Sequence, residues 1–219
     1  WRIGYNQAEI FEALDLWGLP EETNEKGNSR RVWLPRGILI PCLDRDNLYY
    51  LKFRRPVIDP HDPKKYIKVK GSKAGLFGAA NLRGAWLGVL TEGELDCMIL
   101  DQEAGNMAGI ATLGSASDRA TRLDMGLWGR YFLSCAFILA PYDSDMAGAK
   151  GLRALESFSQ RVRHAPLPEL AGVKDITDLW KIGGDLGDWL ARTVEALGLL
   201  PGGPVDIIGH LFNQAERAF

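Results

Sequence analysis

The sequence has few of the residues that build metal centres, disulfide frameworks or membrane spans. Its 219 residues include three cysteines and three histidines, all isolated from one another. Such scattered ligands argue against a zinc site within this chain, and isolated cysteines are typical of reduced thiols in the cytosol. No apolar run approaches the roughly 18 residues that a membrane-spanning helix needs, and no signal-peptide pattern opens the chain. We therefore expect a cytoplasmic protein without a membrane partner, and the start at Trp1 instead of Met is typical of an excerpt from a longer protein.

The chain as a whole also lacks a large excess of positive or negative charge, but its charged residues are unevenly distributed. The formal net charge is −2. Residues 52–73 contain eight Lys or Arg and two Asp, a net charge of +6, which leaves −8 for the remainder. A basic run is often only a solvated face. Here the charges alternate with Phe53 and Tyr66 in a strand-like pattern, which favours a surface that holds a nucleic-acid backbone.

The first 84 residues read as a small mixed α+β subdomain that carries this basic segment. Apolar residues at helical spacing after Asn6 predict a short helix over residues 6–16. Further on, two apolar runs flank a polar turn, which is typical of a hairpin. The predicted strands of this part cover residues 36–43, 48–55 and 66–70.

From Ala85 onward, buried-strand runs alternate with amphipathic helical segments. This alternation predicts an α/β fold with a parallel sheet covered by helices on both faces, over residues 85–184. A helical tail is expected over 185–219, with helices near 185–197 and 205–218. The predicted strands of the parallel sheet cover residues 85–91, 109–114, 135–143 and 162–168, and the predicted helices between them cover 94–105, 116–132 and 146–161.

Acidic residues follow two of these predicted parallel strands. Glu92 comes directly after the first strand, and Asp143 and Asp145 come at the end of the third. In a parallel α/β sheet the ligand site lies outside the carboxyl ends of the strands. Carboxylates that gather there repel each other unless a cation joins them, and Mg²⁺ is the cation that such oxygen ligands usually hold. The sequence therefore predicts a Mg²⁺ site at this edge.

Two neighbours of Glu92 extend the pattern. Gly93 lets the chain turn from strand into helix, and Asp96 lies one helical turn beyond Glu92, where it can face the same crevice. The competing interpretation is that these acids only serve the helices, with Asp145 as an N-cap and Asp96 as a solvated helix residue.

At this point the sequence resembles a known family. "TEGELD" (91–96) is similar to the Glu-Gly-x-x-Asp motif of Toprim domains, and "DSDMAG" (143–148) is similar to their Asp-x-Asp-x-x-Gly motif. Further segments resemble bacterial and phage-type DNA primases, so that the likeness covers roughly residues 1–185. These segments are "WRIGYN", "PKKYIKVKGSKAGLFGA", "ATLGSA" and "LPELAGVKDITDLW". The resemblance implies a Toprim-type parallel sheet in a primase catalytic core that lacks the zinc ribbon and the helicase module.

The resemblance also implies roles for single residues. Glu92, Asp143 and Asp145 would be the catalytic, metal-linked acids, with Asp96 and Asp175 as further metal-site acids. Many primases place a second Asp two residues after the last of these, where this chain has Thr177, so that a further acid at this edge is in doubt. The residues expected to hold nucleic acid or nucleotide are Arg54, Arg55, Lys64, Lys65, Lys68 and Lys73.

The implied activity is the synthesis of short RNA primers on single-stranded DNA from ribonucleoside triphosphates. It would depend on Mg²⁺, with Mn²⁺ as a substitute, and a replicative helicase would be engaged through a part outside this chain. Whether Glu92 binds metal or acts as an acid or base stays open. Two other interpretations remain: a Toprim-family nuclease, although no GxxxxGK[ST] loop of an ATPase is present, and a catalytically silent, RecR-like DNA-binding scaffold.

Overall fold

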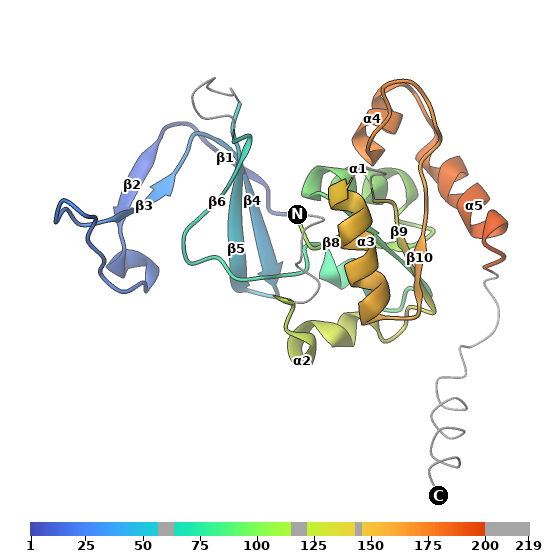
Figure 1. The fold of residues 1–219 in the computed structure, drawn as a ribbon, viewed down its shortest axis with the longest axis horizontal. Coiled ribbons are helices and arrows are strands. Elements are labelled where there is room, and N and C mark those ends of the chain that lie inside the picture. Colours follow the sequence, from blue (N-terminus) through green and yellow to red (C-terminus); the bar gives the residue numbers. More distant parts are fainter. Residues whose placement is uncertain (57–63, 115–121, 143–145, 200–219) are drawn as a thin grey trace, which may run out of the picture.

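The computed structural model describes residues 1–56, 64–114, 122–142 and 146–199. An antiparallel N-terminal half stands beside a half built on a parallel sheet (Figure 1). Within the described residues, no helix is both long enough and apolar enough to cross a membrane.

The N-terminal half is built on a four-stranded antiparallel sheet. Its strands are β1 (Gly4–Asn6), β4 (Gly37–Asp44), β5 (Asn47–Arg54) and β6 (Tyr66–Lys68), in the order β1-β4-β5-β6. Side chains alternate along β5: Leu51 and Phe53 enter a small core, whereas Tyr50 belongs to the main core that this sheet shares with the other half. Lys52 lies on the same face as Tyr50. The sheet therefore turns a partly charged face toward the parallel half.

The helix predicted over residues 6–16 is wrong. The structure has β2 (Ile10–Ala13) there, paired antiparallel with β3 (Arg31–Leu34), followed by a 3-10 turn, η1 (Asp15–Trp17). Short isolated helices are marginal in water, and β3 offers this segment a partner. Val32 is fully buried in the small core, where it packs with Leu14 and Phe53. The pairing of β2 with β3, about 20 residues away in the chain, therefore outweighs the helical spacing of the apolar residues in this segment.

The predicted parallel sheet is confirmed. Its strands are β7 (Leu87–Thr91), β8 (Gly109–Thr112), β9 (Phe137–Ala140) and β10 (Val162–His164), in the order β10-β9-β7-β8, and each neighbouring pair is parallel. Every residue of β7 is buried, as expected for a central strand with helices on both faces. The carboxyl ends of β7, β8 and β9 therefore meet at one edge.

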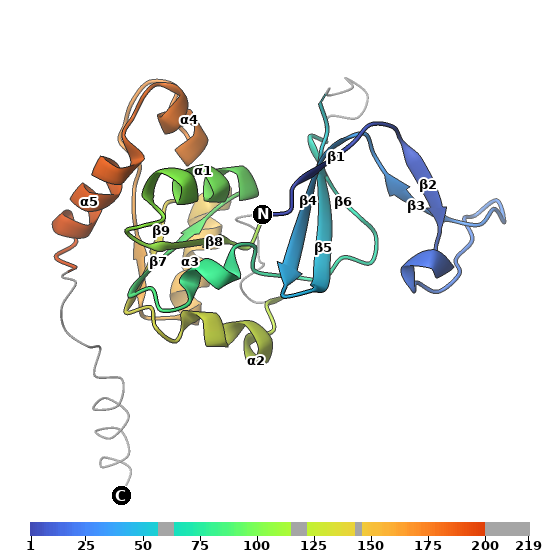
Figure 2. The same cartoon turned by 180° about the vertical axis from the view of Figure 1, so that it is seen from behind.

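Helices cover both faces of this sheet. Helix α3 (Met146–Phe158) lies in front of the sheet in Figure 1, and α1 (Glu94–Ala104) lies in front in Figure 2, which shows the back. Helices α4 (Ile176–Lys181) and α5 (Leu186–Ala196) pack against α1, and α5 confirms the helix expected near 185–197. The other helical pieces among the described residues are short: η2 (Ala79–Leu82), α2 (Met125–Trp128) and η4 (Gly129–Phe132). The helix expected over 205–218 lies outside the described residues.

Candidate active site

Glu92 lies where the sequence predicted it, directly after β7 at the carboxyl edge of the parallel sheet. The hydroxyl of Thr112, the last residue of β8, donates to the carbonyl oxygens of Thr91 at 2.7 Å and of Glu92 at 3.2 Å. These hydrogen bonds hold the exit of β7 against the end of β8. Glu92 itself is half-buried, so its side chain is partly shielded from water at this edge of the sheet.

The same carboxylate lies close to the end of β9. Burial raises the pKa of the Tyr142 phenol, and the nearby charge of Glu92 raises it further. Tyr142 immediately precedes Asp143 in the chain. Asp143 and Asp145 lie outside the described residues, so their assignment as catalytic acids stays a prediction.

Asp96 and Asp175 are held by helix α4. Asp96 Oδ1 accepts hydrogen bonds from the backbone N of Thr177 at 3.1 Å and from its Oγ1 at 2.6 Å. Asp175 Oδ1 caps α4 by accepting from the backbone N of Asp178 at 2.7 Å. Burial, together with the charge of Asp175, raises the pKa of Asp96, and its two hydrogen bonds to Thr177 oppose this rise. Thr177 thus gives Asp96 donors where a second acid would repel it.

No group of three or more His, Cys, Asp or Glu side chains suited to a metal ion is found in the described parts of the chain. The predicted cluster needs Asp143 and Asp145, which these parts do not include. The metal-binding role of Glu92, Asp96 and Asp175 therefore stays a prediction.

Sequence reasoning missed Glu94, the buried acid in this turn. It is 2% exposed. Its Oε2 accepts from Lys52 Nζ at 2.6 Å, and its Oε1 accepts from the Tyr50 hydroxyl at 2.9 Å. Lys52 also donates to the carbonyl oxygen of Gly114 at 2.8 Å. One lysine of the antiparallel sheet thereby joins the start of α1 to the end of β8.

Helical periodicity could have indicated this position. Glu94 shares the buried face of α1 with Cys97, Leu100 and Ala104, at spacings that place all four on one side of a helix. A carboxylate on an apolar face needs a charged or hydrogen-bonding partner. The inward position of Lys52 on β5 would then have supplied the candidate.

The predicted basic residues fall into two groups, and the first faces the acidic end of α1. Lys52 and Arg54 lie on one face of β5, directly opposite Lys68 and Tyr66 of β6. Lys68 donates to the carbonyl oxygen of Lys73 at 2.7 Å. Burial raises the pKa of Tyr66, while the charge of Arg54 opposes this and the charges of Glu94 and Asp96 add to it. The basic face of β5 and β6 therefore lies within electrostatic reach of these acids.

The second group lies around the start of β6 and on the surface. The Arg55 guanidinium lies 5.7 Å from the centre of the Trp33 ring, beside the β2–β3 ribbon. Lys64, Lys65 and Lys73 are exposed. Of these, Lys65 lies 5.8 Å from the centre of the Tyr66 ring, next to the first group.

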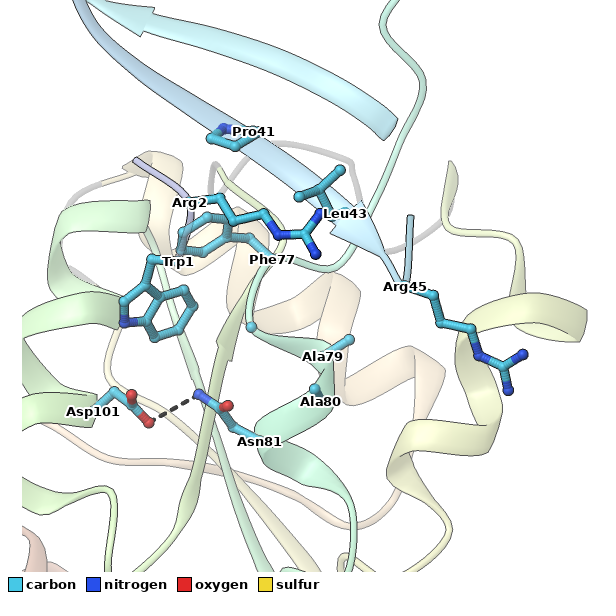
Figure 3. A pocket seen from close by; sticks show the side chains of 11 residues that line it. Trp1, Arg2, Pro41, Leu43, Arg45, Phe77, Ala79, Ala80, Asn81 and Asp101 are labelled. Atoms are coloured by element: carbon cyan, nitrogen blue, oxygen red, sulfur yellow. Dashed lines mark hydrogen bonds between the residues drawn. The ribbon is translucent and has the colours of Figure 1, made fainter. Parts of the chain in front are cut away.

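A separate hollow of about 430 Å³ contains none of the predicted site residues (Figure 3). The ring of Trp1 forms one wall, stacked on Phe77 with ring centres 4.7 Å apart. Across from it, Asn81 donates a hydrogen bond of 2.8 Å to Asp101, drawn as a dashed line. This hollow is not part of the site around Glu92.

Comparisons with known proteins relate this fold to solved structures. No family model matches the chain, and no curated protein matches it either. Among solved structures, the RNA polymerase domain of Mycobacterium tuberculosis primase DnaG, in complex with a double-stranded DNA oligomer with a 6-nucleotide overhang, matches with a TM-score of 0.60 and 18% identity. The primase fragment of the bacteriophage T7 primase-helicase protein matches with a TM-score of 0.55 and 26% identity. The fold is of the primase type.

The extent of these matches differs between the two proteins. The alignment covers 87% of this chain with the mycobacterial domain and 74% with the phage fragment, and in both cases it covers 66% of the other chain. A third structure, of bacteriophage T7 lagging-strand DNA polymerase interacting with primase domains of two gp4 subunits bound to an RNA/DNA hybrid and dTTP, matches over 90% of this chain with a TM-score of 0.55 and 23% identity. The expected α/β class with a helix-flanked parallel sheet is confirmed.

Proposed function

We propose that this chain is a Toprim-type catalytic core of a DNA primase, which joins ribonucleotides on a single-stranded DNA template. The observation that carries the proposal is the opposition of two surfaces. Glu92 stands at the carboxyl edge of the parallel sheet, and the basic face of β5 and β6 meets the adjoining start of α1, where Lys52 donates to Glu94 at 2.6 Å. Acids beside a basic floor suit chemistry on a phosphate backbone.

The donors at this edge fit a hard divalent cation. The charge of Glu92 acts on Tyr142, and the two acids of "DSDMAG" follow Tyr142 in the chain, so that the donor set would consist of carboxylates from neighbouring strands. Glu92, Asp143 and Asp145 would hold Mg²⁺, or Mn²⁺ in its place, with Asp96 and Asp175 behind them. The cation supplies charge neutralisation at the phosphate and orientation of the reacting oxygens.

The residues of the chain itself then divide the remaining work. Arg54, Lys65 and Lys68 bind phosphates of the template or of the incoming ribonucleotide. Glu92 either binds the cation or accepts the proton of the attacking 3′-hydroxyl. Lys52 already neutralises Glu94, so it positions the turn that carries Glu92 and does not contact phosphate. A replicative helicase would be engaged through a part outside this chain.

The test compares Glu92→Gln with Glu103→Gln, an exposed glutamate of α1, the helix that follows Glu92. Primer synthesis is measured on single-stranded DNA with ribonucleoside triphosphates and Mg²⁺ or Mn²⁺, within a chain that also carries the upstream region. We expect Glu92→Gln to lose synthesis by at least roughly 100-fold, with DNA binding retained, and Glu103→Gln to match the wild type.

Three results would contradict the proposal. Synthesis at the wild-type rate by Glu92→Gln would remove Glu92 from the reaction. Cleavage of DNA by the wild type, without synthesis, would identify a nuclease. Binding of DNA by the wild type without either reaction would identify a scaffold.

A further inference from the structure

Two arginines that donate to one tyrosine hydroxyl form a cluster away from Glu92. The Arg83 and Arg130 guanidiniums lie 4.8 and 5.0 Å from the centre of the Tyr131 ring. One terminal nitrogen of each donates to the Tyr131 hydroxyl, at 3.1 Å from Arg83 and 3.4 Å from Arg130. The two guanidiniums are therefore neighbours that share a single acceptor.

A buried carboxylate orients this cluster from the antiparallel sheet. Asp44, the last residue of β4, is 5% exposed. Its Oδ2 accepts from Arg130 at 2.6 Å, and its Oδ1 accepts from the Tyr131 hydroxyl. Tyr131 is itself 2% exposed. Because its neighbours are buried and hydrogen-bonded, Arg130 is held in one orientation before any ligand arrives.

The positive charge of the cluster exceeds the negative charge that compensates it. Asp44 is one carboxylate against Arg83 and Arg130, and Arg45 follows Asp44 at the exposed turn of the hairpin, extending from the end of β4 in Figure 3. Arg83 is exposed, and the side chain of Arg130 is 42% exposed. Within the part of the chain that the structure describes, Nε and the other terminal nitrogen of both arginines have no hydrogen-bond partner.

We propose that Arg83 and Arg130 together bind a phosphate group. Two adjacent planar guanidiniums with unused N–H donors match the several acceptor oxygens of a phosphate. Because both guanidiniums already stack on the Tyr131 ring, their side chains lose less conformational entropy when a ligand binds. A lysine ammonium lacks this planar fork of donors, so the presence of arginine at both positions fits phosphate binding.

The position of the cluster favours a phosphate of a single nucleic-acid strand. Asp44 lies four residues along β4 from Ile40, which stands in the same row of the sheet as Lys52 and Lys68, and this separation is about 13 Å at the usual rise of a strand. Both places lie on the border between the two halves of the molecule. A strand on the basic face of β5 and β6 can therefore reach this second site. The assignment of the bound phosphate to a nucleic-acid strand, and not to a free nucleotide, rests on the proposed function. The inference that Arg83 and Arg130 bind a phosphate does not depend on it.

The experiment uses Arg83→Gln, because Arg83 does not touch Asp44, with Arg192→Gln on α5 as the matched control. Binding of oligo(dT) and of inorganic pyrophosphate is measured without divalent cations or ribonucleotides, over a range of salt concentrations. We expect Arg83→Gln to weaken oligo(dT) binding roughly 3- to 10-fold and to lower the slope of log K against log salt by about 0.7. Arg83→Lys should recover only part of the affinity, and Arg192→Gln should bind as the wild type.

The outcomes separate this site from the proposed function, because none of these measurements needs primer synthesis. An effect of Arg83→Gln on pyrophosphate alone would support a phosphate site but overturn its assignment to a strand. Unchanged affinity and salt slope for both probes, with an unchanged unfolding temperature, would overturn the site altogether.

Discussion

At the scale of single residues, two glutamates two positions apart have opposite environments. Glu92 is half-buried at the strand end, whereas Glu94 is buried in contact with Lys52 and Tyr50. Gly114 belongs to the same contact, because a Cβ there would lie 2.6 Å from Glu94 Oε1. Its φ of +77° also disfavours any side chain. The absence of a side chain at Gly114 is therefore a condition for the buried ion pair.

Replacing Gly114 with Ala should lower the free energy of unfolding by roughly 2–4 kcal/mol, since it combines backbone strain with a steric clash. Gly198→Ala is the matched control: its φ is +63°, and no heavy atom lies within 4 Å of the added Cβ. Urea unfolding of both variants measures the difference. Equal losses for the two variants would show that only the backbone conformation matters.

At the scale of elements, the Lys52–Glu94 pair joins β5 to the start of α1. It is almost dry, with side-chain exposures of 11% and 2%. Removing one member of such a pair leaves an uncompensated charge, whereas replacing both by apolar residues is often neutral. The pair also fixes the Gly114 carbonyl through Lys52, so that a single ammonium group of β5 holds both the start of α1 and the chain just after β8.

The single variants Lys52→Met and Glu94→Leu should each lose about 3–5 kcal/mol of unfolding free energy, and the double variant should regain most of it. A double-mutant cycle in urea measures the coupling. The double variant should still synthesise primers poorly, because no group then holds the Gly114 carbonyl. Additive losses in the cycle would mean that the two charges do not stabilise each other.

At the scale of the whole molecule, buried polar clusters join the two halves in addition to the continuous main core. Among the described residues, one cluster joins Lys52 and Tyr50 to Glu94, and another joins Asp44 to Arg130 and Tyr131. Burial alone would raise the pKa of Asp44, but the hydrogen bonds from Tyr131 and Arg130 outweigh it, and the pKa lies below its usual value. The charged form of Asp44 is therefore favoured in the folded state.

This shift predicts a pH dependence of stability. A carboxyl group whose pKa is lower in the folded state stabilises the fold above its unfolded pKa, and this contribution is lost as the pH falls through the folded value. We expect the wild type to lose stability below about pH 4, and Asp44→Asn to be less stable at pH 7 with a smaller loss in acid. Thermal unfolding between pH 2.5 and 7 measures both. A parallel pH profile for the two proteins would contradict the role of Asp44.

Much of the fold and part of the site could be predicted from local patterns. The period of apolar residues identified the parallel strands and the helix near 185–197, and the strand-end acid Glu92 was placed correctly because the ends of parallel strands share an edge. The segment after Asn6 was misread, because its strand pairs with residues about 20 positions away. The pairing of Glu94 with Lys52 and the Arg83–Tyr131–Arg130 cluster were missed for the same reason, since each depends on contacts between distant segments, although helical periodicity could have indicated that Glu94 is buried.

The sequence by itself determined the class of the fold, the position of Glu92 and the basic character of residues 52–73, because these depend on composition and on short-range periodicity. Only the tertiary structure decided which charges meet. It buried Lys52 against Glu94, attached Asp96 to Thr177 and brought Arg83 and Arg130 to one tyrosine. The physical reason is that desolvation and pairing of charges depend on distances between side chains, which the order of residues along the chain does not contain.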